Sequence, residues 1–131
     1  MADLVFFYGT LMTPFNRTGR LDQLLSFRGH GTIRAVLFDL GIYPAAVPTD
    51  DGQVTGEVYE LHVPLAALRV LDELEGYRPG DPETSLYTRT RTPVVMDDGS
   101  LVYAWAYFYN APLGRAERIP SGDYLEHLNL R

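Results

Sequence analysis

Residues 87–109 read YTRTRTPVVMDDGSLVYAWAYFY, two runs of strand-forming residues separated by a short polar segment. β-Branched and aromatic residues of this kind are enriched in strands. Asp98-Gly99 lies between the runs, and such a dipeptide is favoured in hairpin turns because the central positions need positive φ. The sequence therefore predicts an antiparallel hairpin of Tyr87–Met96 and Leu101–Tyr109.

The second strand of this hairpin has two uncharged faces. Side chains alternate along a strand, so one face holds aromatic residues and the other small or apolar ones. Because neither face is charged, we expect both to be covered. The aromatic face suits either the wall of a cavity or a core in which the hydroxyls find local partners. Its members are Leu101, Tyr103, Trp105, Tyr107 and Tyr109, opposite Val102, Ala104, Ala106 and Phe108.

The rest of the chain adds further strands and one clear helix. Pro64 opens a helical run that ends at Glu75, with Gly76 in the position of a helix stop. Together these segments indicate a mostly antiparallel α+β domain or a small barrel. We expect strands at Leu4–Tyr8, Gly31–Asp39 and Gln53–Leu61, a short helix at Leu21–Phe27, an irregular segment at Gly41–Pro48, and loops at Thr10–Asn16 and Tyr77–Ser85.

Length and composition exclude several classes of protein. A chain of 131 residues predicts a single domain spanning residues 1–131. It has no Cys and no Lys, which excludes disulfide scaffolds, thiolate chemistry and Schiff-base lysines. A net charge of −6 disfavours nucleic acid and anionic membranes as partners. The N-terminus lacks the positive charge of a signal peptide and no long apolar run occurs, so we expect a cytoplasmic protein.

Familiar cofactor and metal motifs fail. Gly29-His30-Gly31 begins like a dinucleotide loop, but Arg34 stands where a third glycine is needed. The three histidines, His30, His62 and His127, are far apart and lack metal-binding spacing. We therefore expect no cofactor and no metal. Carboxylates, hydroxyls and backbone donors remain as candidate chemical groups.

Glu75 is the carboxylate of most interest. On a helical wheel Leu68, Leu71 and Leu74 define an apolar sector, and Glu75 falls inside it. Burial, the carbonyl end of the helix and the neighbouring acids would all raise its pKa. A Glu with a raised pKa can act as a general acid and base. The alternatives are that Glu75 points to water from a frayed last turn, or pairs with an arginine such as Arg89.

Tyr8-Gly9-Thr10-Leu11 is the second candidate. A glycine directly after a buried strand lets the backbone turn sharply and expose successive N–H groups. Such a nest can bind a carboxylate without a basic side chain. The alternative is a simple turn that ends the strand.

These pieces together resemble the gamma-glutamylcyclotransferase-like family, which includes gamma-glutamylamine cyclotransferases. Each matching segment is short, but they occur in the family's order and spacing over most of the chain. They are Val5–Leu11, Gly41–Pro44, Gly56–Tyr59, Leu71–Tyr77, Tyr87–Arg89, Ala104–Tyr107 and Ile119–Tyr124.

The resemblance implies a fold and a set of site residues. The fold would be a small mixed, mostly antiparallel β-barrel with flanking helices. Tyr8, Gly9, Thr10 and Leu11 would hold a glutamyl head group through main-chain donors, and Glu75 would be the catalytic acid. By strand parity, Tyr107 could line the same pocket. Arg89 would anchor Glu57 or Glu75, or meet a substrate carboxylate.

The implied reaction is an intramolecular acyl transfer on a small γ-glutamyl compound. The substrate's α-amine attacks its own γ-carbonyl, giving 5-oxoproline and a free amine or amino acid, and no cofactor is required. Two alternatives stay open: a non-catalytic small-ligand binder, and a hydrolase that releases glutamate. Leaving-group specificity is expected in Thr13–Arg20 and Tyr77–Leu86, and a monomer is the default expectation.

Overall fold

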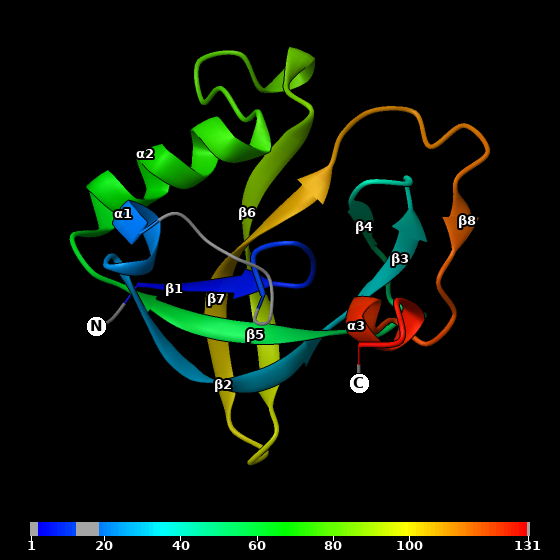
Figure 1. The fold of residues 1–131 in the computed structure, drawn as a ribbon, viewed down its shortest axis with the longest axis horizontal. Helices are drawn as coiled ribbons and strands as arrows, with labels where there is room; N and C mark the ends of the chain where they lie inside the picture. Colours follow the sequence, from blue (N-terminus) through cyan, green and yellow to red (C-terminus); the bar gives the residue numbers. More distant parts are fainter. Residues whose placement is uncertain (1–2, 13–18, 131) are drawn as a thin grey trace.

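The predicted hairpin is present in the computed structural model, which describes residues 3–12 and 19–130. Its strands are β6 (Tyr87–Met96) and β7 (Leu101–Tyr109), with the bounds that the sequence predicts. They pair antiparallel from Tyr87 opposite Tyr109 to Val95 opposite Leu101. In Figure 1 this ladder runs behind β1 and β5, with its turn at the bottom of the view.

Five strands close into a barrel in the order β1-β5-β2-β6-β7. The additional members are β1 (Leu4–Phe7), β2 (Leu25–Ile33) and β5 (Val54–Leu61). Neighbours pair antiparallel except where β1 meets β7 in parallel, with Val5 opposite Trp105. The barrel is therefore mixed and mostly antiparallel, and the predicted fold class is confirmed.

A three-stranded sheet lies beside the barrel in the order β4-β3-β8 (Figure 1). It comprises β3 (Ala35–Asp39), β4 (Pro44–Pro48) and β8 (Glu117–Arg118). The expectation of an irregular segment at 41–48 is wrong over β4. Its prolines lie at the two ends of an edge strand, where a missing N–H donor is tolerated, while Ala45 and Ala46 between them are fully buried.

The segment 19–39 also differs from expectation. A helix at 21–27 was expected, but α1 (Gly19–Asp22) is shorter and starts earlier, and Leu25 already pairs with Leu61 in the barrel. The single strand expected at 31–39 is two strands, because the chain leaves the barrel after Ile33 and enters the second sheet at Ala35. Of the loop expected at 10–16, residues 13–16 lie outside the described residues.

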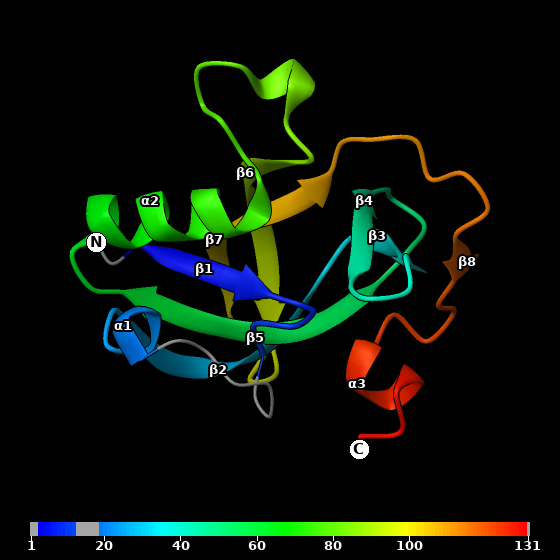
Figure 2. The same ribbon diagram turned by 45° about the horizontal axis from the view of Figure 1, so that its top comes forward.

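Helix α2 (Pro64–Glu75) begins and ends where the sequence predicts and lies across the barrel beside β1 (Figure 2). Gly76 ends it in a left-handed conformation with φ of 67°, which favours glycine. The buried residues of α2 are Ala67, Leu68, Leu71 and Asp72. The predicted apolar sector is therefore right for Leu68 and Leu71 and wrong for Leu74, which is 55% exposed.

The barrel interior forms the main core. Helices α1 and α2, strand β3 and the turn after β1 add to it, and the largest fully buried side chains are Phe6, Met12, Leu21, Leu37, Leu71, Val5, Val54, Val58 and Val94. The expectation that both faces of β7 are covered is wrong at its start, where Leu101 and Tyr103 are exposed. Shorter elements complete the fold: the 3-10 helix Pro82–Thr84, and α3 (Tyr124–His127), whose His127 bonds to Asp39 at 2.8 Å. Within the described residues, no helix has the length and apolar character needed to cross a membrane.

Candidate active site

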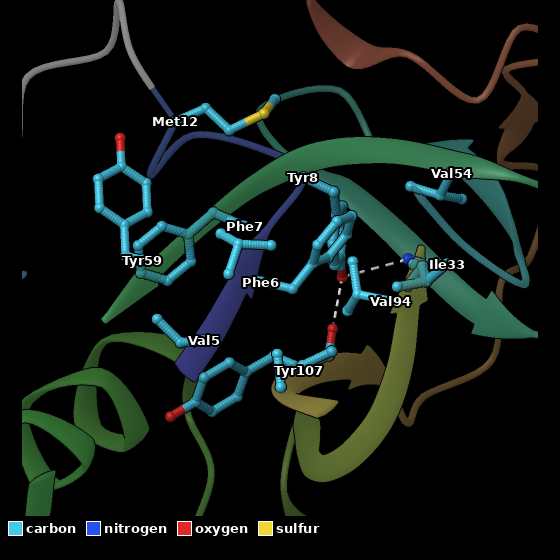
Figure 3. Close-up of a cluster of buried hydrophobic side chains, with 14 of the residues drawn as sticks. Val5, Phe6, Phe7, Tyr8, Met12, Ile33, Val54, Tyr59, Val94 and Tyr107 are labelled. Atoms are coloured by element: carbon cyan, nitrogen blue, oxygen red, sulfur yellow. Dashed lines mark hydrogen bonds between the residues drawn. The ribbon is translucent and has the colours of Figure 1, made fainter. Parts of the chain in front are cut away.

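A cavity of about 340 Å³ opens beside the end of α2, where the turn after β1 meets β6 and β7. This volume lies in the range of small-molecule sites. The cavity brings together Glu75, Tyr107 and the predicted turn residues 8–11, and Figure 3 shows Tyr8 and Tyr107 among the buried side chains. It is lined by Phe6, Phe7, Tyr8, Gly9, Thr10, Leu11, Tyr43, Pro44, Glu73, Leu74, Glu75, Gly76, Leu86, Tyr87 and Tyr107.

The turn after β1 forms one wall. The N–H of Met12 donates to the carbonyl of Gly9 at 3.0 Å, which closes a tight turn over residues 9–12. A Cβ on Gly9 would lie 2.7 Å from Cγ of Pro44, so a larger residue would push β4 away. Thr10 is exposed and Leu11 is half-buried at this wall. This wall of the cavity is therefore a tight turn that begins at a glycine packed against Pro44.

Glu75 forms the opposite wall and is half-buried. Within residues 3–12 and 19–130, its carboxyl has no hydrogen-bond or ion-pair partner. Burial raises the pKa of Glu75 from 4.5 to about 7. The expected pairing with Arg89 is not formed. A carboxyl that is unpartnered and half-protonated near neutral pH can both accept and donate a proton.

Three tyrosine hydroxyls surround this carboxyl, and each donates to another acceptor. Tyr8 donates to the carbonyl of Tyr107 at 2.6 Å, as Figure 3 shows, and Tyr87 donates to the carbonyl of Pro44 at 2.8 Å. Tyr107 donates to Oδ1 of Asp72 at 2.6 Å. Burial raises the pKa of all three phenols, and the Glu75 charge raises each further. They therefore stay protonated, and Glu75 is the cavity carboxyl whose pKa burial moves toward neutrality.

Arg89 bonds to Asp72 and to neither of its expected partners. Its Nε donates to Oδ1 of Asp72 at 2.8 Å, and a second guanidinium nitrogen donates to Oδ2 at 3.2 Å. Asp72, placed by the sequence at the edge of the apolar sector, is 7% exposed. Arg89 lines a separate hollow and not the Glu75 cavity, so the expectation that it meets a substrate carboxylate in that cavity has no support.

Glu57 lies elsewhere in the barrel. It is 3% exposed on β5 and accepts a hydrogen bond from the hydroxyl of Tyr59 at 3.0 Å, while Nε2 of His30 lies 3.8 Å from its Oε2. Among the described residues, no three His, Asp or Glu side chains are grouped as metal ligands would be. Two segments were expected to set specificity. In Thr13–Arg20, residues 13–18 lie outside the described residues. In Tyr77–Leu86, Leu86 lines the cavity, as does Gly76 just before the segment.

Sequence reasoning gave no role to Tyr87, Pro44 or Asp72. Strand parity is a signal that could have found Tyr87, because it pairs with Tyr109 and shares a face of β6 with Arg89. Pro44 was noted within a motif, but its contact with Gly9 depends on how β4 folds back. The role of Asp72 becomes clear when its partners on β6 and β7 are known.

Comparison with known proteins identifies the family of the chain. The family model described as "Gamma-glutamyl cyclotransferase, AIG2-like" matches residues 5–126. The chain belongs to the AIG2-like gamma-glutamyl cyclotransferase family. The family resemblance seen in the sequence is thereby confirmed.

Individual relatives cover nearly the whole chain. The gamma-glutamylcyclotransferase family protein ytfP of Citrobacter rodentium is 34% identical over 122 residues, which are 93% of this chain and 95% of that protein. The crystal structure of an AIG2-like protein from Mus musculus has a TM-score of 0.67 at 26% identity, covering 85% of this chain and 80% of that one. YkqA of Bacillus subtilis gives a TM-score of 0.73 at 27% identity; the match covers 99% of this chain but 42% of YkqA.

Proposed function

We propose that this AIG2-like protein is a cyclotransferase that converts a small γ-glutamyl compound to 5-oxoproline and a free amine or amino acid. The observation that supports this best is Glu75, an unpartnered carboxyl in a cavity, with a pKa near 7. Family membership supports the same reaction class. The hydroxyls of Tyr8, Tyr87 and Tyr107 are committed to other acceptors, and the second acid on the wall, Glu73, is exposed, so Glu75 is the carboxyl best suited to moving protons.

The turn after β1 would hold the glutamyl head. Backbone N–H groups of residues 9–11 would bind the substrate's α-carboxylate, because successive amides form an anion-binding concavity without a basic side chain. This placement would bend the glutamyl chain so that its α-amine approaches its own γ-carbonyl. Holding two groups of one molecule in such a near-attack geometry removes much of the entropic barrier.

Glu75 would then transfer the proton. The ionised carboxylate takes a proton from the substrate's α-ammonium, and the α-amine nitrogen forms a bond to the γ-carbonyl carbon. Glu75 gives this proton to the leaving nitrogen as the bond from that carbon breaks. The carboxylate then takes the second proton from the new ring nitrogen and passes it to the departing amine, so the lactam is neutral and the amine leaves as an ammonium ion. The nucleophile belongs to the substrate, and the protein contributes one acid–base group and the geometry.

The test is product analysis on a panel of γ-glutamyl amino acids, γ-glutamyl amines and glutathione. We expect 5-oxoproline by mass spectrometry from the wild type and none from Glu75→Gln, which keeps the side-chain shape but cannot transfer the proton. Glu83→Gln is the matched control, because Glu83 is an exposed acid outside the cavity. Glutamate in place of 5-oxoproline would identify a hydrolase. Ligand-dependent thermal stabilisation without any product would identify a binding protein.

A further inference from the structure

The Glu75 carboxyl lies between two points held by the same arginine. Three residues before it, Asp72 receives two hydrogen bonds from Arg89, at 2.8 and 3.2 Å. Two residues after it, the ring of Tyr77 lies 5.6 Å from the Arg89 guanidinium carbon, which also lies 4.5 Å from the centre of the Trp105 ring. Arg89 therefore contacts the chain on both sides of Glu75.

The partners of Asp72 fix how α2 sits on the barrel. Arg89 on β6 and Tyr107 on β7 are directly opposite each other in the strand ladder. Both donate to Oδ1 of Asp72, at 2.8 and 2.6 Å. An acid that bonds to both members of one cross-strand pair sets the rotation and the axial position of its helix. Asp72 and Glu75 lie about 60° apart around a helix, so fixing one direction fixes the other.

The helix end is held in the same way. The N–H of Tyr77 donates to the carbonyl of Asp72 at 2.8 Å, and that of Gly76 to Glu73 at 3.3 Å. These bonds turn the chain back so that the Tyr77 ring reaches Arg89. Arg89 itself lines a separate hollow beside α2 and is not among the residues that line the Glu75 cavity.

We propose that Arg89 is a positioning residue: through Asp72 and Tyr77 it holds the last turn of α2 so that the Glu75 carboxyl faces the cavity, and it balances the Asp72 charge beside that carboxyl. The catalytic consequence rests on the proposed cyclotransferase function. The electrostatic consequence belongs to the fold and is measurable without substrate.

The charges around Glu75 determine in which direction its pKa should shift when Arg89 or Asp72 is replaced. The groups facing it are the neutral phenols of Tyr8, Tyr87 and Tyr107, each from a different segment, together with Tyr43 and the exposed Glu73 on the cavity wall. Behind them lies the Asp72–Arg89 pair, whose opposite charges compensate. Removing Arg89 leaves an uncompensated anion one helical turn from Glu75, and removing the Asp72 charge leaves an uncompensated cation.

The experiment compares Arg89→Gln, Arg89→Lys and Asp72→Asn with Arg91→Gln as the matched control. Arg91 shares the β6 face of Arg89 and lies 5.6 Å from the Trp105 ring, but it is exposed and bonds to no residue of α2 among those described. The readouts are the NMR titration of the Glu75 carboxyl carbon and the pH profile of 5-oxoproline formation.

We expect Arg89→Gln to move the Glu75 titration to higher pH and Asp72→Asn to move it to lower pH, each by about one pH unit. Arg89→Gln should lower kcat by at least about 10-fold with little change in KM, since a small displacement of a catalytic group has effects of this size. Arg89→Lys keeps the charge but loses the two-point bond, so it should lower kcat while leaving the titration in place. Arg91→Gln should change neither.

An unshifted Glu75 titration in both Arg89→Gln and Asp72→Asn would overturn the proposal. So would a loss of activity in Arg89→Gln that merely follows the loss of folded protein. If Arg89→Gln does not fold, the other two variants still test the proposal. The Glu75 titration should stay in place in Arg89→Lys and move to lower pH in Asp72→Asn. A wild type that yields no 5-oxoproline, but whose variants titrate as expected, would refute the proposed function and leave the positioning role standing.

Discussion

Replacing Glu75 with Gln should stabilise the protein in proportion to how far the pH lies above the ordinary pKa of a glutamate. The pKa of Glu75 is raised by burial from 4.5 to about 7. Between these values the folded state binds more protons than the unfolded state, so wild-type stability falls as pH rises. Below pH 4.5 the carboxyl is protonated in both states and this penalty is absent.

The size of the effect follows from the shift. One pKa unit corresponds to about 1.4 kcal/mol, so a rise from 4.5 to about 7 costs about 3 kcal/mol of folding free energy once Glu75 is fully ionised. Glu75→Gln has the shape of the protonated side chain and no titration. Its stability relative to wild type should therefore rise by about 3 kcal/mol between pH 4 and pH 8.

Urea unfolding of both proteins at half-unit steps from pH 4 to pH 8.5 measures this difference, because all other carboxylates titrate alike in the two. Glu83→Gln is the matched control, and its difference from wild type should stay flat with pH. A pH-independent difference for Glu75→Gln would mean that Glu75 is solvated in the folded state. In that case the reasoning from its burial is wrong, and the case for it as an acid–base group loses its physical basis.

Three further expectations follow from the same geometry. The rate of 5-oxoproline formation should rise with pH through an apparent pKa of about 7, because the base form of Glu75 is needed; a profile that is flat from pH 4 to 8 contradicts this. Gly9→Ala should raise KM and lower stability by about 1–3 kcal/mol, as its Cβ would meet Pro44 at 2.7 Å; unchanged KM and melting temperature would count against a closely packed turn. Leu71→Ala should lower the free energy of unfolding by about 2–5 kcal/mol, whereas Leu74→Ala should change it by no more than about 0.5 kcal/mol, both measured by urea unfolding; equal losses would mean that Leu74 is buried as the helical wheel predicted.

Local patterns were sufficient for the hairpin and the main helix. Alternation and a turn dipeptide specify β6 and β7, and a proline start with a glycine stop specifies α2. The same local signals failed at β4, where Pro44 and Pro48 indicate irregular backbone. Edge position, which decides whether a proline is tolerated, is a property of the assembled sheet.

Glu75 could be found from its place on a helical wheel, although one of the three leucines that drew the wheel is exposed. Asp72 and Glu75 both face the barrel, and the sequence does not tell which acid Arg89 will bond. That choice depends on which rung of the β6–β7 ladder lies under α2, and rung position depends on barrel closure. Pairing across elements is therefore the part of the site that sequence reasoning missed.

The parallel contact between β1 and β7 has a consequence for how this protein is made. Val5 pairs with Trp105, so β1, which leaves the ribosome before β7, has to wait for β7 before the barrel closes. Pairings so distant in sequence form late and make folding slow. The bond from Tyr8 to the carbonyl of Tyr107 also has to wait for β7. Binding of a cavity ligand to nascent chains should therefore begin only when β7 has emerged from the exit tunnel, and it would report when the barrel closes.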